Sequence, residues 1–255
     1  MPNGQQGKIW SQHLVEVICL GNAEQIIRNA IREGRTSLLE PEAKEICLEF
    51  GIPVTNSFIA KNEDEAARQA KELGFPVVLK IVSPDILHKS DVGGVVVGLS
   101  DEEHVRQAFR SILHNVNTKK PGSRVVGILV AEMAPQSTEV IVGMVTDPQF
   151  GPALMFGLGG IFVEVLKDVT FRIAPITEVD AREMIEEIKA FPILKGYRGY
   201  PPADLDSIVR ILMAVSKLVM ERPEINQLDL NPIEVYEKGA KVVDARIIIA
   251  SALST

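Results

Sequence analysis

Short apolar runs alternate with amphipathic segments along the first half of the chain. Apolar residues spaced by three and four positions, such as Ile27, Ala30 and Ile31, are typical of one face of a helix. Asn62 and Ser100 each stand three residues before an acidic residue, which is a helix-start signal. The pattern predicts helices over 22–34, 38–50, 62–74 and 100–115, and strands over 52–60, 76–81, 95–97 and 124–131. The order from residue 52 predicts a small sheet with helices on one face.

The second half of the chain shows a different arrangement of the same two patterns. It predicts strands over 139–146, 153–156 and 171–175, helices over 178–190 and 205–221, and a terminal hairpin of strands 228–236 and 241–249. Two glycine-bearing stretches, 157–160 and 195–202, are expected to form loops. The second half therefore differs from the small sheet with helices on one face that is predicted for residues 52–131.

Composition narrows the class of protein. The chain has 255 residues, of which 46% are hydrophobic, and this is enough for one large domain or two small ones. Its net charge of −7 argues against broad nucleic-acid binding. No apolar run approaches the ~20 residues of a membrane helix, and the N-terminus lacks the pattern of a signal peptide. Cys19 and Cys47 form neither a disulfide framework nor a metal pattern, so we expect a cytoplasmic protein with no membrane partner.

The stretch 80–99 joins two apolar runs through a polar turn and contains two lysines, a histidine, two aspartates and a pair of glycines. The paired glycines Gly93 and Gly94 let backbone N–H groups approach an anion, and Lys80 adds a positive charge from the first run. His88 is the side-chain type that changes charge near neutral pH and can also attack phosphorus. The stretch therefore predicts a phosphate-binding hairpin. A solvated loop histidine is the alternative interpretation of His88.

Asn231 and Asp244 lie on consecutive strands of the predicted terminal hairpin, so a turn can place them opposite each other. Asp229 precedes Asn231 by two residues and shares its face of the strand. Oxygen ligands of this kind suit Mg²⁺ that is bound partly through substrate phosphates. Turn and edge chemistry in an ordinary hairpin is the alternative.

Two further stretches are candidates. Residues 132–135 follow a predicted strand, at a position where adenine commonly bonds to backbone groups between two half-domains. An ordinary strand end is the alternative there. The glycine cluster at 157–160 lies near Arg172, which can stabilise charge on a transferring phosphoryl group. Glycine clusters are usually turns, so this last signal is weak by itself.

Taken together, the stretches 76–95, 129–175, 194–204, 228–235 and 242–247 resemble the ATP-grasp family. Within that family the chain is most similar to the β subunits of ADP-forming acyl-CoA synthetases, which are relatives of succinyl-CoA synthetase. The resemblance covers roughly residues 22–252, with the motifs in the expected order. It implies two α+β subdomains that enclose ATP or ADP. Residues 1–51 would then be N-terminal helices, 52–131 the small lid subdomain, and 132–255 the large subdomain with the metal site.

The resemblance also implies roles for individual residues. Lys80 matches a phosphate-contacting lysine beside Gly93 and Gly94, and His88 matches a histidine that relays phosphate with Asp229 as its acidic partner. The resemblance also matches Asn231 and Asp244 to Mg²⁺ ligands, and Glu132 with its neighbours Met133 and Ala134 to the adenine and ribose segment, with Glu139 as a further nucleotide-binding candidate. Arg172 stays a catalytic candidate because of its place near the glycine cluster.

The resemblance further implies a partner. Such enzymes need a CoA-binding domain and a phosphohistidine domain, which this sequence does not contain, so we expect a separate α subunit and an α2β2 assembly. The reaction would convert acyl-CoA, ADP and phosphate to acid, CoA and ATP. Two alternatives stay open: another ATP-grasp carboxylate ligase, and a non-catalytic ATP-grasp-like regulatory module. The identity of the acid and the preference for ADP over GDP are also left open.

Overall fold

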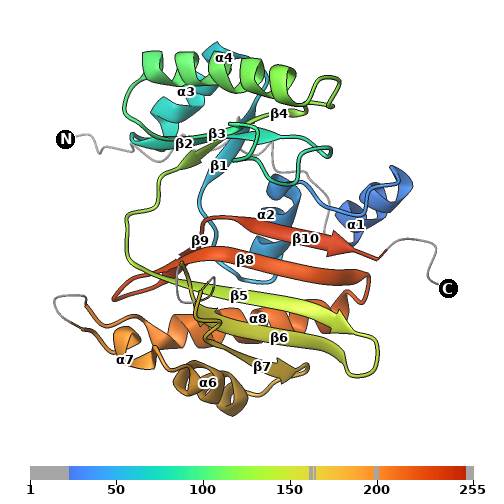
Figure 1. Ribbon diagram of the computed structural model, residues 1–255, viewed down its shortest axis with the longest axis vertical. Helices are drawn as coiled ribbons and strands as arrows, with labels where there is room; N and C mark the ends of the chain where they lie inside the picture. Colours follow the sequence, from blue (N-terminus) through green and yellow to red (C-terminus); the bar gives the residue numbers. More distant parts are fainter. Residues whose placement is uncertain (1–22, 161–162, 164, 198–200, 251–255) are drawn as a thin grey trace, which may run out of the picture.

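The computed structural model describes residues 23–160, 163, 165–197 and 201–250. Cys19, with the rest of residues 1–22, and part of the predicted 195–202 loop lie outside the described residues. Two sheets with separate hydrophobic cores form two lobes, an upper and a lower one in Figure 1. The predicted α+β class is confirmed. None of the helices in the described part of the chain has the length and apolarity that crossing a membrane requires.

The upper lobe is the predicted strand-helix-strand-strand-helix-strand unit. Its antiparallel sheet has the order β1-β4-β2-β3, made of β1 (Ser57–Ala60), β2 (Val77–Val82), β3 (Val95–Leu99) and β4 (Gly127–Glu132). Two helices pack against this sheet, α3 (Glu63–Leu73) and α4 (Glu102–Lys119). Asn62 and Asp101 cap them by accepting hydrogen bonds from the third residue on. The capping pattern therefore located both helix starts to within two residues.

The lower lobe is built on a six-stranded sheet. Five of its strands follow the order β10-β8-β5-β6-β7, namely β5 (Thr138–Asp147), β6 (Gly151–Leu158), β7 (Val169–Ile173), β8 (Ile225–Val235) and β10 (Ala245–Ile249). The sixth, β9 (Ala240–Val242), pairs with β8. The helices α6 (Glu178–Glu187), α7 (Phe191–Leu194) and α8 (Leu205–Glu221) lie on one face of this sheet, with α8 behind its strands in Figure 1.

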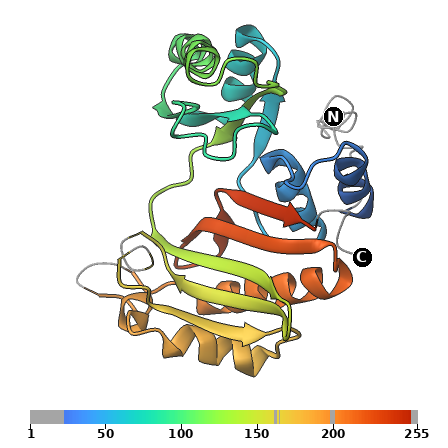
Figure 2. The same ribbon diagram turned by 45° about the vertical axis from the view of Figure 1, so that its right-hand side comes forward.

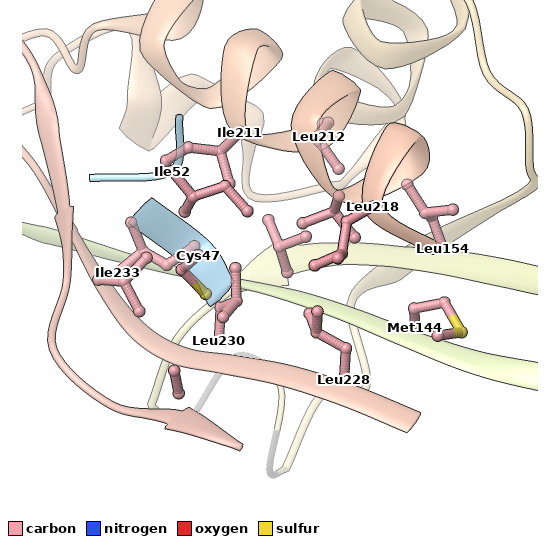
Figure 3. Close-up of a cluster of buried hydrophobic side chains, with 14 of the residues drawn as sticks. Cys47, Ile52, Met144, Leu154, Ile211, Leu212, Leu218, Leu228, Leu230 and Ile233 are labelled. Carbon is pink, nitrogen blue, oxygen red and sulfur yellow. The ribbon is translucent and has the colours of Figure 1, made fainter. Parts of the chain in front are cut away.

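Helix α8 supplies much of the lower core. Its buried stripe includes Ile211, Leu212 and Leu218, which belong to one cluster with Met144 and Leu154 of the sheet, and Ile211 lies beside Ile52 (Figure 3). The apolar spacing that predicted this helix is therefore the spacing that buries it. The opposite face of the sheet carries no helix from α6 to α8, and it is turned toward the upper lobe (Figure 2).

Two N-terminal helices complete the described fold. These are α1 (Ala23–Arg32) and α2 (Glu40–Glu49), and α2 contacts β10 as well as β1. Ala43 and Cys47 of α2 belong to the lower core, so this helix is anchored to the lower lobe. Burial raises the pKa of the Cys47 thiol to about 12, which leaves it as an unreactive core side chain.

The structure differs from the sequence prediction at three strands. The predicted strand over 241–249 is divided, because Val243 donates its N–H to Pro232 and leaves the ladder between β9 and β10. The predicted loop over 157–160 begins inside β6. A Cβ on Gly157 would lie 2.9 Å from the Asp168 carbonyl oxygen, so this glycine permits close approach of β7. The strand expected from residue 52 begins only at Ser57.

Candidate functional site

A cavity of about 130 Å³ lies where the two lobes and helix α2 meet. Its walls come from the start of α2, the end of β2 with the loop that follows, and the adjacent strands β8 and β10. The charged and amide side chains that line it are Glu40, Lys89, Asp229, Asn231, Asp244 and Arg246. Residues from the first, second and last quarters of the sequence thus meet at one place.

The structure brings the three predicted oxygen-bearing residues together. Asn231 donates its backbone N–H to the carbonyl oxygen of Asp244 over 3.1 Å, so these two residues face each other across the break between β9 and β10. Asp229 lies on the same face of β8 as Asn231 and is paired in register with Arg246. Desolvation raises the pKa of Asp229, while the charge of Arg246 opposes that shift.

A buried carboxylate, Glu40, holds the lysines of the site. The Lys80 Nζ lies 2.8 Å from Oε1 of Glu40, the Lys89 Nζ lies 2.9 Å from Oε2, and the Lys44 Nζ lies 3.3 Å from Oε1. The Glu40 side chain is only 2% exposed. Lys80 and Lys89 also approach Oδ2 of Asp244, at 3.4 and 3.5 Å. Three positive and two negative side chains therefore share the space between the lobes, with a net positive charge.

These contacts shift the pKa values of the cluster. Burial would raise the pKa of Glu40, but the lysine charges outweigh it and lower the pKa to about 2. Burial would likewise lower the pKa of Lys89, and Glu40 and Asp244 instead raise it. Lys44 behaves differently, because its burial outweighs its partners and lowers its pKa. Desolvation raises the pKa of Asp244, and the charge of Glu40 adds to that shift.

His88 occupies the loop beside this cavity, and its side chain is exposed. Its neighbour Lys89 lines the cavity, whereas His88 does not. No described residue contacts the His88 imidazole through a hydrogen bond or ion pair.

The two glycines of this loop have packing roles in the structure. Gly93 adopts φ = +67°, a conformation that L side chains rarely adopt. A Cβ on Gly94 would lie 2.5 Å from Cγ2 of Ile81 and 2.9 Å from the carbonyl oxygen of Lys89. The Gly94 N–H donates to that same carbonyl oxygen. Gly94 therefore lets the loop fold tightly against β2.

The predicted adenine segment lies at the connection between the lobes. Glu132, the last residue of β4, accepts hydrogen bonds from Asn56 and from Lys241, the latter over 2.6 Å. Burial would raise the pKa of Glu132, but these bonds lower it. Met133 and Ala134 follow directly, and the Met133 side chain is 39% exposed. Glu132 thus ties the connection to Asn56 and Lys241, and Met133 donates its N–H to the carbonyl oxygen of Pro76 over 3.3 Å.

Glu139 is exposed on β5, opposite Glu234 of β8. Burial and the neighbouring charge of Glu234 both raise the pKa of Glu139. Glu139 lies beside Gly159, and a Cβ on that glycine would lie 3.0 Å from the Cβ of Glu139. It does not line the cavity that holds Asp244.

Arg172 is not brought to the site, contrary to the prediction. Strand register places it in line with Leu154 and Leu228, on the helix-covered face of the sheet. Asp229 lies on the opposite face, because side chains alternate along a strand. The Arg172 guanidinium instead forms ion pairs with Glu183 and Glu187 of α6. The sequence placed it near the glycine cluster without revealing which face it occupies.

The structure adds Glu40, Lys44 and Lys89 to the candidate site. Lys89 is the neighbour of His88 in the predicted hairpin, whereas neither Glu40 nor Lys44 was singled out from the sequence. One signal was available for the first. Glu40 precedes Ala43 and Cys47 by three and seven residues, so a carboxylate falls on the apolar stripe of a predicted helix. A charge on a buried stripe requires a partner, and two of the three partners here, Lys80 and Lys89, come from the other lobe.

The donor set fits Mg²⁺ that is shared with a phosphate ligand. Among the described residues, no group of three or more His, Cys, Asp and Glu side chains forms a complete metal cage. Asn231 and Asp244 nevertheless present amide and carboxylate oxygens to one cavity beside two lysines. Mg²⁺ usually binds through one or two carboxylates plus substrate phosphates, and lysines bind those phosphates.

Comparison with known proteins agrees with this geometry. The ATP-grasp domain family matches residues 29–249. The chain is 53% identical over 230 residues to the β subunit of the ADP-forming acetate–CoA ligase I of Pyrococcus furiosus, covering 90% of this chain and 99% of that subunit. It is 48% identical over 227 residues to the ADP-forming acetate–CoA ligase I of Archaeoglobus fulgidus, covering 89% of this chain but 33% of that longer protein.

A solved structure supports the same assignment. The acetyl-coenzyme A synthetase 1 of Candidatus Korarchaeum cryptofilum, in complex with coenzyme A and Mg-AMPPCP, matches with a TM-score of 0.80 and 48% identity. The match covers 90% of this chain and 100% of the solved one, and the phosphohistidine segment of that enzyme points towards its nucleotide binding site. The chain therefore belongs to the ATP-grasp family, among the β subunits of ADP-forming acetate–CoA ligases.

Proposed function

We propose that this chain binds ADP and ATP for an ADP-forming acyl-CoA synthetase, which converts acyl-CoA, ADP and phosphate to acid, CoA and ATP. The observation that carries the proposal is the cavity between the lobes. There Lys80 and Lys89 face Asp244, beside Asn231. Lysines for phosphate and oxygen ligands for a cation within one small space are the requirements of phosphoryl transfer.

In this proposal Asn231 and Asp244 hold Mg²⁺, which neutralises charge on the nucleotide phosphates. Lys80 and Lys89, both in the upper lobe, bind oxygens of the nucleotide phosphates. The segment at Met133 and Ala134, of which Met133 is exposed, offers backbone groups to adenine. The other ATP-grasp ligases that activate a carboxylate directly need no carrier histidine. His88 is exposed and pairs with none of the described residues, which favours the acyl-CoA synthetase.

His88 acts as a phosphate carrier in the proposal. A phosphohistidine of the partner transfers its phosphoryl group to an imidazole nitrogen of His88, with cleavage of one P–N bond and formation of another. A β-phosphate oxygen of ADP then attacks the phosphorus, and the P–N bond to His88 breaks as ATP forms. Asp229 would orient the imidazole at the nucleotide end of this path, and the nearby Lys89 would neutralise charge on the phosphoryl group.

The partner is a separate α subunit, most simply in an α2β2 assembly. The sequence of the Archaeoglobus relative is about three times as long as the matched region. A partner chain would supply what that longer protein carries in addition, including the CoA-binding and phosphohistidine parts. The acid that the enzyme uses is expected to depend on that partner.

The nucleotide role is tested by ADP binding to the isolated chain. We expect ADP to bind more tightly with Mg²⁺ than with a chelator, because the cation bridges Asp244 and the phosphates. Asp244→Ala should remove most of this gain, about tenfold or more in the dissociation constant. Isothermal titration calorimetry with and without Mg²⁺ measures the gain.

The matched control is Asp64→Ala, because Asp64 is an exposed residue of α3 outside the cavity. It should keep the wild-type gain. Equal ADP affinity with and without Mg²⁺ in the wild-type chain would refute the metal assignment.

A further inference from the structure

Glu40 is the most buried charge of the candidate site and has no part in the proposed reaction. It comes from α2, whose Ala43 and Cys47 are packed in the lower core. Its carboxylate reaches across to Lys80 on β2 and to Lys89 in the loop that follows. A carboxylate anchored in one lobe thus holds two lysines of the other.

The distances show which carboxylate holds the lysines more closely. Lys80 Nζ lies 2.8 Å from Glu40 but 3.4 Å from Asp244, and Lys89 Nζ lies 2.9 Å from Glu40 but 3.5 Å from Asp244. Hydrogen bonds between charged groups are typically ~2.7–2.9 Å long, so only the contacts to Glu40 have that length. Asp244 is also the more accessible of the two, with a side chain 35% exposed against 2% for Glu40.

We propose that Glu40 is a positioning residue, which keeps the ammonium groups of Lys80 and Lys89 away from the Asp244 carboxylate so that this carboxylate can accept a cation. The inference rests on the proposed function, in which Asp244 is the cation ligand. A lysine has a long, flexible side chain, and an ammonium group near an available carboxylate pairs with it. Without Glu40, Asp244 is the nearest anion to both lysines, so they would close on it and compete with Mg²⁺.

Lys44 provides the comparison that separates this mechanism from a general charge effect. It pairs with Glu40 and donates to the Thr55 hydroxyl over 2.9 Å, but it forms no ion pair with Asp244. Removing Lys44 or Lys89 therefore restores the same net charge after the loss of Glu40. Only the removal of Lys89 takes away a competitor for Asp244.

The experiment compares two charge-balanced double variants, Glu40→Gln with Lys44→Met and Glu40→Gln with Lys89→Met. For each we measure by calorimetry the factor by which Mg²⁺ tightens ADP binding. This factor is a ratio for one variant, so a loss of phosphate contacts that affects both conditions equally does not alter it. Circular dichroism and thermal unfolding verify that each variant is folded. Glu45→Gln, on the same helix but outside the cavity, is the control and should keep the wild-type factor.

We expect the variant with Lys44→Met to lose about tenfold or more of the Mg²⁺-dependent gain. The variant with Lys89→Met should recover at least half of that loss on a logarithmic scale. A wild-type gain in the Lys44→Met variant, or equal losses in both variants, would overturn the role of Glu40. A wild-type chain without any Mg²⁺-dependent gain would instead overturn the proposed function.

Discussion

Replacing His88 by asparagine is expected to reduce ATP formation by the assembled enzyme about a thousandfold or more, which corresponds to ~4 kcal/mol of activation free energy. Asparagine retains polarity and hydrogen-bonding capacity but cannot form a phosphorylated nitrogen intermediate. The affinity for ADP should remain close to that of wild type, because His88 does not line the cavity that holds Asp244. Phosphorylation of the partner by acyl-CoA and phosphate should also persist.

The control for this experiment is His114→Asn, because His114 is an exposed residue on α4 whose imidazole lies outside the cavity. Its turnover should equal that of wild type. ATP formation is measured with the α subunit present. Labelling with radioactive phosphate distinguishes the phosphorylated α subunit from this chain phosphorylated at His88. A His88→Asn enzyme that keeps a tenth or more of wild-type turnover would show that this histidine is not an obligatory carrier.

Glu40→Gln is expected to lower the free energy of unfolding at pH 6 by about 3–5 kcal/mol, because it leaves buried lysines without their carboxylate. The difference in the free energy of unfolding between wild type and Glu40→Gln should become smaller as the pH falls. The folded-state pKa of Glu40 is lowered to about 2, so its stabilisation is complete above its ordinary pKa and is lost as pH falls toward 2. Between pH 6 and pH 3.5 the stability gap to wild type should narrow by about 1 kcal/mol.

Urea unfolding at the two pH values measures this gap. Glu45→Gln is the matched control, since burial raises the pKa of Glu45 rather than lowering it. The difference in the free energy of unfolding between Glu45→Gln and wild type should not shrink between pH 6 and pH 3.5. A Glu40→Gln gap that stays constant between pH 6 and pH 3.5 would mean that the ion pairs with Lys80 and Lys89 do not stabilise the folded chain.

Secondary structure was largely predictable because burial in this fold follows local periodicity. Helix α8 spans Leu205–Glu221 in the structure, which are the residues expected from the spacing of its apolar stripe. The division between β9 and β10 was not predictable. It depends on hydrogen bonds of Val243 and Asp244 to residues 232 and 231, which apolar alternation does not encode.

The candidate site was only partly predictable, because some of its residues meet through local geometry and others through tertiary packing. Asp229 and Asn231 share a strand, and a short connection limits where Asp244 can lie, so local geometry brings these three together. Glu40 reaches the site from a helix 40 residues before Lys80, through tertiary packing that no local pattern reveals. Arg172 shows the opposite case, since proximity in sequence to a glycine cluster did not reveal its face of the sheet.

The central claim is that this chain supplies the nucleotide site of an acyl-CoA synthetase and requires a partner for the full reaction. The most direct measurement is ATP formation from acetyl-CoA, a panel of other acyl-CoA thioesters, ADP, phosphate and Mg²⁺. It is made with this chain alone, with its cognate α subunit alone, and with both mixed. The account predicts ATP only in the mixture, at a rate that saturates with ADP. ATP formation by this chain alone, or none from the mixture with any thioester although the two subunits associate, would contradict it.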